Sequence, residues 1–304
     1  MSLIAAALII TSAFMHATWN FVSKRSYPSL AFFFLTAVSA ALVMAPALYT
    51  YRHSVAHIAT PVWILIVATG LAQAIYFFGL AGAYRAGDIS LAYPLARALP
   101  VLFIAAISLL LRGGGAIGRW GLVGMVMITA GCIILPLPHF RRLRPGHYAN
   151  IVTLMALVAA VGTTAYTLID DQALRHLRSS PTVQLSTVEI TLLFISLQTI
   201  STAVMLGLAA VLIKGEREQF RRLLNSRRVP VTALVTGVVI MATYGLVLAA
   251  MAYVTNVSYV AAFRQLSIPI GALLGLILAR EPRFRPKLIG IGIVMIGLLL
   301  VGIG

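Results

Sequence analysis

Residues Val229–Phe263 read VPVTALVTGVVIMATYGLVLAAMAYVTNVSYVAAF, a stretch of 35 positions without a single Asp, Glu, Lys or Arg. A helix needs about 20 apolar residues to cross the roughly 30 Å hydrocarbon layer of a membrane, so this stretch is too long for one crossing. The pair Thr255-Asn256 is the available turn signal inside it. We therefore predict two membrane-spanning helices here, over Val229–Val254 and Val257–Ala279.

The composition of the whole chain also indicates a membrane protein. Of its 304 residues, 61% are apolar and 10% are charged, whereas a soluble domain has about 45–50% apolar and 25% charged residues. This hydrophobicity excludes a disordered chain, and a single cysteine excludes a disulfide framework. The net charge is +16, but the Lys and Arg residues lie in short gaps between apolar runs. That pattern suits anionic membrane lipids as a partner and excludes nucleic acid.

Counting the apolar runs in the same way predicts an all-α integral membrane protein with ten transmembrane helices. A membrane β-barrel is excluded because its strands alternate apolar and polar residues, whereas these runs are apolar at both parities. The other eight helices are expected at Leu3–Val22, Ser29–Tyr49, Pro61–Tyr84, Ile89–Leu111, Arg119–Leu137, Tyr148–Ile169, Ser186–Ile213 and Lys287–Ile303.

The basic residues between these runs predict the orientation. The loops after odd-numbered helices hold 16 Lys and Arg, and the loops after even-numbered helices hold 5. Cytoplasmic loops carry the excess of basic residues. The odd loops are therefore expected in the cytoplasm, with both chain ends on the outside.

The two halves of the sequence resemble each other. At an offset of 169 positions, Pro100 aligns with Pro269 and Gly121 with Gly290; at an offset of 147, Trp19 aligns with Tyr166. Repeats of five helices, over residues 1–138 and 148–304, must insert with opposite topology because five is odd. Inverted repeats around a midplane site are typical of secondary transporters. A duplicated membrane scaffold without transport is the alternative.

Three stretches carry a resemblance to a known family. They are His16-Ala-Thr-Trp19-Asn20, Ala92-Tyr-Pro-Leu-Ala-Arg97-Ala-Leu-Pro100, and Val260-Ala-Ala-Phe-Arg264-Gln265-Leu-Ser-Ile-Pro269 continuing through Leu278-Ala-Arg-Glu281-Pro282. With the ten helices in two halves, the chain resembles the EamA-like branch of the drug/metabolite transporter (DMT) superfamily. The resemblance implies a basket-like bundle whose central cavity is lined by helices 1, 3, 4, 6, 8 and 9. It departs from the family at Arg112, where relatives usually carry Glu, as Glu281 does in the second half.

Two arginines inside the predicted spans are the main candidate site residues. Arg97 and Arg264 lie about nine and eight residues into their helices, roughly 12–14 Å deep at 1.5 Å per residue. A charge at this depth is costly, and a guanidinium suits a carboxylate or a phosphate. We expect one or both to bind an anionic group of a substrate. The alternative is a structural arginine, neutralised by Glu189, by an aspartate or by backbone carbonyls.

Further polar and aromatic residues are expected to line the same cavity. His16, Trp19 and Asn20 share one helix face because they are spaced i, i+3, i+4, and histidine can carry a proton at physiological pH. An interhelical hydrogen-bond cluster is the alternative interpretation. The remaining candidates for substrate contact are Gln73, Tyr76, Tyr93, Tyr166, Tyr244 and Gln265. Asp170 and Asp171 are expected near a helix end, and Gln198 as a packing contact.

The sequence contains none of the standard catalytic or metal-binding motifs. It has no HExxH, no G-x-S-x-G, no Walker P-loop and no Cys/His cluster with zinc spacing. We therefore expect no enzyme activity, no catalytic residues, no metal and no cofactor.

These expectations combine into a secondary active transporter of the bacterial inner membrane. It would move a small polar metabolite, anionic or zwitterionic, by alternating access. One alternative is an exporter of neutral or amphipathic metabolites, drugs or amino acids, with structural arginines. The other is a non-transporting receptor or assembly subunit. A small-molecule substrate is the expected partner, and a homodimer remains open.

Overall fold

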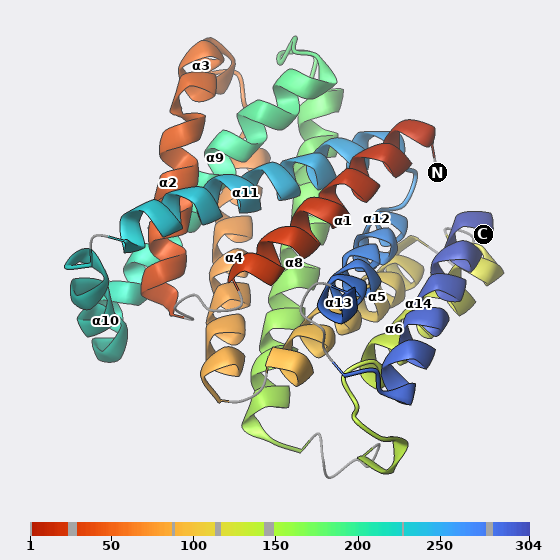
Figure 1. Ribbon diagram of the computed structural model, residues 1–304. Coiled ribbons are helices and arrows are strands. Elements are labelled where there is room, and N and C mark those ends of the chain that lie inside the picture. The colour runs from red at the N-terminus through yellow and green to blue at the C-terminus, as the bar shows by residue number, and fades with distance from the viewer. Residues whose placement is uncertain are drawn as a thin grey trace.

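The computed structural model describes residues 2–23, 29–86, 89–112, 117–142, 149–226, 228–277 and 282–304 (Figure 1). These residues form helices joined by turns, and no strand lies among them. Seven helical stretches are long and apolar enough to cross a membrane, so the chain is an all-α, multi-pass membrane protein. They are Leu30–Thr50, Thr60–Ala86, Ile151–Ser179, Thr187–Leu212, Val229–Tyr253, Val257–Leu274 and Arg285–Ile303.

Helices lie over the apolar runs that the sequence predicts. The number of ten crossings and the two-repeat division stay predictions, because three of the apolar stretches are shorter: Leu3–Ala17, Leu95–Leu110 and Arg119–Ile134. The main helices are α1 (Leu3–Ser23), α2 (Leu30–Thr50), α4 (Thr60–Ala86), α5 (Ile89–Arg112), α6 (Arg119–Ile134), α8 (Ile151–Ser179), α9 (Thr187–Leu212), α11 (Val229–Ala250), α12 (Val257–Phe263), α13 (Ser267–Ile277) and α14 (Arg285–Ile303).

The long uncharged stretch divides where the turn signal predicts. Helix α11 ends at Ala250, a 3-10 turn η2 follows over Met251–Tyr253, and α12 begins at Val257. The side chain of Asn256 accepts a hydrogen bond from the Ser258 amide over 2.9 Å. This satisfies one of the free N–H groups that every helix start leaves, so Asn256 fixes the start of α12.

The predicted end of the sixth apolar run was wrong. Helix α8 continues to Ser179, so Asp170 and Asp171 lie well inside the helix. The prediction ended the helix at the first charge, but both carboxylates have partners here. Asp171 pairs with Arg175 one turn later over 3.0 Å, and Asp170 is fully buried among hydrogen-bond donors.

The run that carries Arg264 is not one regular helix. A 3-10 turn, η3, covers Arg264–Leu266 between α12 and α13. Pro269 follows three residues later and has no N–H to donate to the carbonyl four positions before it, at Gln265. The α-helical bonding therefore fails at this point, and a tighter turn replaces it. This break sets the direction in which the Arg264 side chain leaves the backbone.

The helices pack in close pairs: α4 lies along α8, α1 along α11, α2 along α9, and α6 along α14 (Figure 1). Small residues bring the backbones together in the last pair. A β carbon at Gly124 would meet the carbonyl oxygen of Gly297, and one at Gly297 would meet that of Gly124. Close backbone approach at glycine is a common source of helix association in membranes.

A short amphipathic helix, α10 (Lys214–Leu224), lies at the end of the bundle opposite α6 and α14 in Figure 1. This helix was not predicted from the sequence. Its Glu216 is buried and accepts hydrogen bonds from the Ala31 amide at the start of α2, over 3.1 Å, and from Arg85 near the end of α4. One carboxylate therefore joins three helices.

Candidate functional site

A cavity of about 980 Å³, including its open part, lies in the middle of the bundle. The family resemblance implied that the predicted helices 1, 3, 4, 6, 8 and 9 line a central cavity. The structure adds the second and seventh, through α2 and α9. The polar and charged lining residues are Ser12, His16, Thr36, Gln73, Tyr76, Arg97, Tyr166, Thr202, Thr243, Tyr244 and Arg264.

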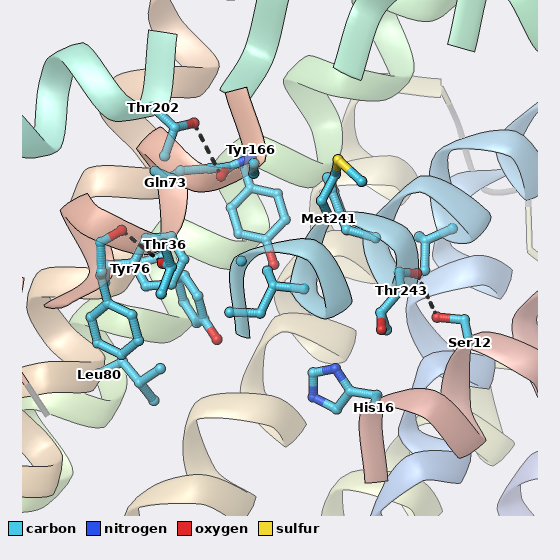
Figure 2. Close-up of a pocket in the computed structure, with 18 of the residues that line it drawn as sticks. Ser12, His16, Thr36, Gln73, Tyr76, Leu80, Tyr166, Thr202, Met241 and Thr243 are labelled. Carbon is cyan, nitrogen blue, oxygen red and sulfur yellow. Dashed lines mark hydrogen bonds between the residues drawn. The ribbon is translucent and has the colours of Figure 1, made fainter. Parts of the chain in front are cut away.

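Seven of the predicted site residues lie in this lining, and one does not. Figure 2 shows His16 of α1, Tyr76 of α4 and Tyr166 of α8 around the same space. Arg97, Arg264, Gln73 and Tyr244 complete the seven. Gln265 instead lines a smaller space of about 310 Å³ behind the arginines. The side chains of Trp19, Asn20 and Tyr93 lie outside the described residues.

Arg97 is buried and its contacts tie three elements together. Its Nη2 donates to the carbonyl oxygen of Arg264 and to the hydroxyl of Ser267, each over 2.9 Å. Its Nη1 lies 3.1 Å from Nε2 of His16. A guanidinium can only donate, so His16 accepts at Nε2 in this arrangement. The imidazole is then neutral, unlike the proton-carrying ring that the sequence allowed.

Arg264 is half-buried, and its side chain makes weaker contacts than that of Arg97. Its Nη2 lies 3.4 Å from the hydroxyl of Tyr166, and its Cζ lies 5.3 Å from the centre of the Tyr244 ring. Within the described chain, carboxylates pair with Arg85, Arg175 and Arg222, and none with Arg264. Its positive charge therefore faces the cavity beside aromatic rings, and no described carboxylate pairs with it.

Glu189, considered above as a neutralising partner, has another role. It forms a capping box at the start of α9, where its side chain accepts from the Ser186 amide over 2.8 Å and the Ser186 hydroxyl accepts from the Glu189 amide. Such a box satisfies the free N–H groups of a helix start. Glu189 therefore belongs to the helix end, as the sequence predicts.

Three tyrosines form a continuous aromatic wall next to Arg264. The rings of Tyr76 and Tyr166 are 5.8 Å apart and those of Tyr166 and Tyr244 are 5.4 Å apart, both edge to face. This arrangement is the favoured one for aromatic pairs. The wall gives the cavity an aromatic surface beside a cation, which suits an anion with an apolar body.

A buried carboxylate that the sequence did not predict as part of the site, Asp170, lies directly behind this wall. The Tyr244 hydroxyl donates to Oδ2 of Asp170 over 2.5 Å, and Gln198 donates to the same oxygen over 2.7 Å. Thr69 donates to Oδ1 over 2.5 Å. Gln198 is thus a hydrogen-bond donor to the carboxyl group of Asp170, not only a packing contact. The pair Asp171 and Arg175, spaced i, i+4, was the sequence signal that the helix continues through Asp170.

Small hydroxyl residues were missed as well, since nothing in the sequence distinguishes them. Thr202 of α9 donates to the side-chain oxygen of Gln73 over 3.2 Å, and Ser12 of α1 donates to the carbonyl of Thr243 over 2.7 Å (Figure 2). These contacts join walls of the cavity that are far apart in the sequence.

One end of the cavity is sealed by a tightly packed apolar cluster. It gathers residues from the start of α1, the end of α2, the start of α4, the end of α8, the start of α9 and the end of α11. Its fully buried members include Ile9, Leu174, Leu177, Leu193, Phe194 and Leu248. We call this group the apolar seal. It separates the cavity from the side on which α1 begins.

Comparison with known proteins supports the fold. No family model matches the chain, and no curated protein matches it. Among solved structures, 26 chains match. One, from a crystal structure named only as that of a "protein", superposes with a TM-score of 0.67 at 16% identity, covering 98% of this chain and 97% of its own. At this identity the likeness shows the fold alone.

Proposed function

We propose that this chain is a secondary active transporter of the EamA-like branch of the drug/metabolite transporter superfamily. It has ten transmembrane helices in two inverted repeats, over residues 1–138 and 148–304, and lies in the bacterial inner membrane. By alternating access it moves a small polar metabolite that carries a carboxylate, phosphate or phosphonate. The observation that carries the proposal is the positive charge of Arg264, which faces a central cavity without a carboxylate partner among the described residues.

The pairing of the helices supports the two-repeat architecture. The predicted counterparts are α1 and α8, α2 and α9, α4 and α11, α5 and α12–α13, and α6 and α14. If each helix is exchanged with its counterpart, the packing of α4 on α8 becomes that of α11 on α1. Likewise, α5 on α8 becomes α13 on α1, and α4 on α9 becomes α11 on α2. The pairs α2–α9 and α6–α14 each map onto themselves. A two-fold relation between the halves accounts for this pattern.

The direction of the counterpart helices supports inversion of one half. Along α6 and α14, Gly124 approaches Gly297 while Gly131 approaches Gly290, so the two helices run antiparallel. Counterpart helices would be parallel if both halves had the same topology. Antiparallel counterparts are what oppositely inserted repeats require.

The cavity and the apolar seal support alternating access. A rocking carrier holds its site open to one side and closed to the other. Here, the seal closes the side on which α1 begins. The opposite state would open the seal and close the other end around the same arginine.

The experiment that tests the proposal is anion flux through the purified protein in liposomes. Labelled succinate, glutamate and inorganic phosphate serve as probes, with a neutral sugar and a cationic amine for comparison. We expect saturable uptake of at least one anion that unlabelled anion competes away. Arg264→Gln should lower this uptake at least tenfold, because it removes the cation but keeps a side chain of similar size.

A matched control separates this effect from a general loss of charge. Arg222→Gln removes an exposed arginine of α10, whose carboxylate neighbour Glu218 is 4.0 Å away at the surface, and should leave uptake unchanged. Uptake limited to the sugar or the amine would favour the exporter of neutral compounds. No flux of any solute by folded protein would favour the non-transporting receptor or assembly subunit.

A further inference from the structure

Asp170 lies at the junction of the cavity and the apolar seal. One turn before it on α8, Tyr166 lines the cavity; one turn after it, Leu174 belongs to the seal. The carboxylate is completely buried. Any movement that opens the seal must change the surroundings of Asp170.

Four helices meet at this carboxylate, and the three other than its own α8 give it only neutral contacts. Thr69 of α4, Gln198 of α9 and Tyr244 of α11 donate to its oxygens over 2.5–2.7 Å. No cation lies within ion-pairing distance of it in the described chain. An ionised carboxylate buried in this way is expensive to maintain, so its protonated form is the alternative state.

The shell around Asp170 can hold either form of the carboxyl. A hydroxyl is both donor and acceptor, so the hydroxyl of Tyr244 or Thr69 can rotate to accept a hydrogen bond from a protonated Asp170. Gln198 continues to donate to Oδ2 in either form. The lone pairs that a metal cation would need are already occupied by donors, which makes a proton the fitting ligand.

One aromatic ring connects this carboxyl to the proposed anion site. The Tyr244 hydroxyl bonds Asp170, while the face of the same ring lies 5.3 Å from the guanidinium carbon of Arg264. Tyr244 also lines the cavity. It can therefore take a proton from water in the cavity and pass its own to Asp170, which leaves the tyrosine unchanged.

The titratable and charged groups that surround Asp170 come from several elements. They are Tyr166 and Asp171 of α8, Tyr244 of α11 and Arg264 of η3, with Arg97 of α5 and His16 of α1 across the cavity. Asp171 is engaged with Arg175. An anion that enters the cavity and the Asp170 carboxylate would therefore both interact with the positive charge of Arg264.

We propose that Asp170 is the proton-coupling site: it gains a proton when an anion binds Arg264, and proton and anion cross the membrane together. This inference rests on the proposed function. An anion at Arg264 repels the Asp170 carboxylate and draws the guanidinium toward itself, so it favours the neutral carboxyl. By linkage, the proton strengthens anion binding by the same factor. The proton comes from water on the entry side and returns to water on the exit side.

The test follows protons and anions in the same vesicles. Proteoliposomes hold the pH-sensitive dye pyranine, and K⁺ with valinomycin clamps the membrane potential at zero. External succinate, glutamate or inorganic phosphate, the probes of the flux assay, should acidify the lumen of wild-type vesicles. A pH difference of one unit, acid outside, should accumulate glutamate up to about tenfold, as one proton per anion requires.

Variants at two neighbouring carboxylates distinguish coupling from structure. Asp170→Asn resembles the protonated form, so it should retain anion exchange across the membrane but lose lumen acidification to the background of empty vesicles. Asp170→Glu should restore acidification. Asp171→Asn, which removes the carboxylate next along α8, should acidify like wild type. Elution volume and melting temperature show that each variant is folded.

The outcomes separate a failure of proton coupling from a failure of the proposed transport function. Anion flux without acidification in the wild type, or equal acidification by Asp170→Asn, would overturn proton coupling and leave the transporter intact. If Asp170→Asn does not fold, the wild-type accumulation under a pH gradient still decides, and accumulation below twofold would overturn the proposal. No flux of any anion would overturn the proposed function itself.

Discussion

The Nη2 group of Arg97 donates to the main-chain oxygen of Arg264 over 2.9 Å, so one cavity arginine holds the backbone that presents the other. The two halves of the predicted repeat contribute one arginine each, but not at equivalent positions, since Arg97 aligns with Leu266 at the offset of 169. The arginines are therefore partners with different tasks. Arg97 donates its hydrogen bonds to protein groups, namely His16, Ser267 and the Arg264 carbonyl. Arg264 faces the cavity and makes one long hydrogen bond, to Tyr166.

Substitution of the two arginines should affect stability differently. Arg97→Gln breaks contacts to His16, Ser267 and the Arg264 carbonyl, and a hydrogen bond to a charged group contributes about 1.5–3 kcal/mol. We expect its melting temperature to fall by several degrees. Arg264→Gln loses only the 3.4 Å contact to Tyr166 and the ring contact, so its melting temperature should stay near that of the wild type. Equal destabilisation of both variants would contradict this division of roles.

The helical part of the fold could be predicted because it depends on local sequence. Apolar runs of span length form helices wherever the chain enters lipid, since backbone groups there must bond within the segment. The break between two helices at Thr255-Asn256 could also be predicted for a local reason, because Asn256 caps the helix that begins after it through the Ser258 amide. Where a helix continues past a charge, as α8 does through Asp170, local sequence was insufficient.

The site could be predicted only in part. A midspan arginine is conspicuous in any sequence, and both arginines line the cavity. The shell of Asp170 depends on contacts between residues about 30 to 100 positions apart, such as Gln198 and Thr69. No pattern along the chain encodes such pairings. They exist only once α4, α8, α9 and α11 have packed together.

The glycine contact between α6 and α14 should stabilise the fold. Gly297→Leu places a side chain against the backbone of Gly124 and Ile128, and overpacking of this kind costs about 1–3 kcal/mol. We expect a lower melting temperature in detergent. Gly292→Leu, on the same helix, is the control, because no atom lies within 4 Å of the β-carbon position there. A melting temperature that is equally lowered in both would show that helix composition, not the contact, is responsible.

The Glu216 carboxylate should stabilise the end of the bundle where α10 lies. Its side chain is 2% exposed and pairs with Arg85, whose side chain is 43% exposed. Glu216→Gln keeps an acceptor for the Ala31 amide but leaves Arg85 without its partner, so we expect a loss of about 1–3 kcal/mol. Glu218→Gln removes an exposed carboxylate of the same helix and should cost under about 1 kcal/mol. Chemical denaturation of both variants in mild detergent measures the difference, and indistinguishable curves would contradict it.

The cavity should be reachable from the cytoplasm in the state described by this structure. The apolar seal closes the side on which α1 begins, and the Lys/Arg distribution predicts that this side is external. Met241 lines the cavity and is half-buried, whereas Leu248, two turns along α11, is fully buried in the seal. Met241→Cys should therefore react with a membrane-impermeant thiol reagent, and Leu248→Cys should not. The native Cys132 is fully buried, so it should add little background.

The side of the reaction tests the orientation. In sealed inside-out vesicles, which expose the cytoplasmic face, Met241→Cys should be modified at least tenfold faster than in right-side-out vesicles. A transported anion bound at Arg264, on the cavity wall that Met241 also lines, should slow the reaction by blocking access. Faster modification in right-side-out vesicles would reverse the predicted orientation. Equal reactivity of Met241→Cys and Leu248→Cys would mean that the apolar cluster does not seal the cavity, because a packed cluster without water gives a charged reagent no path to the thiol.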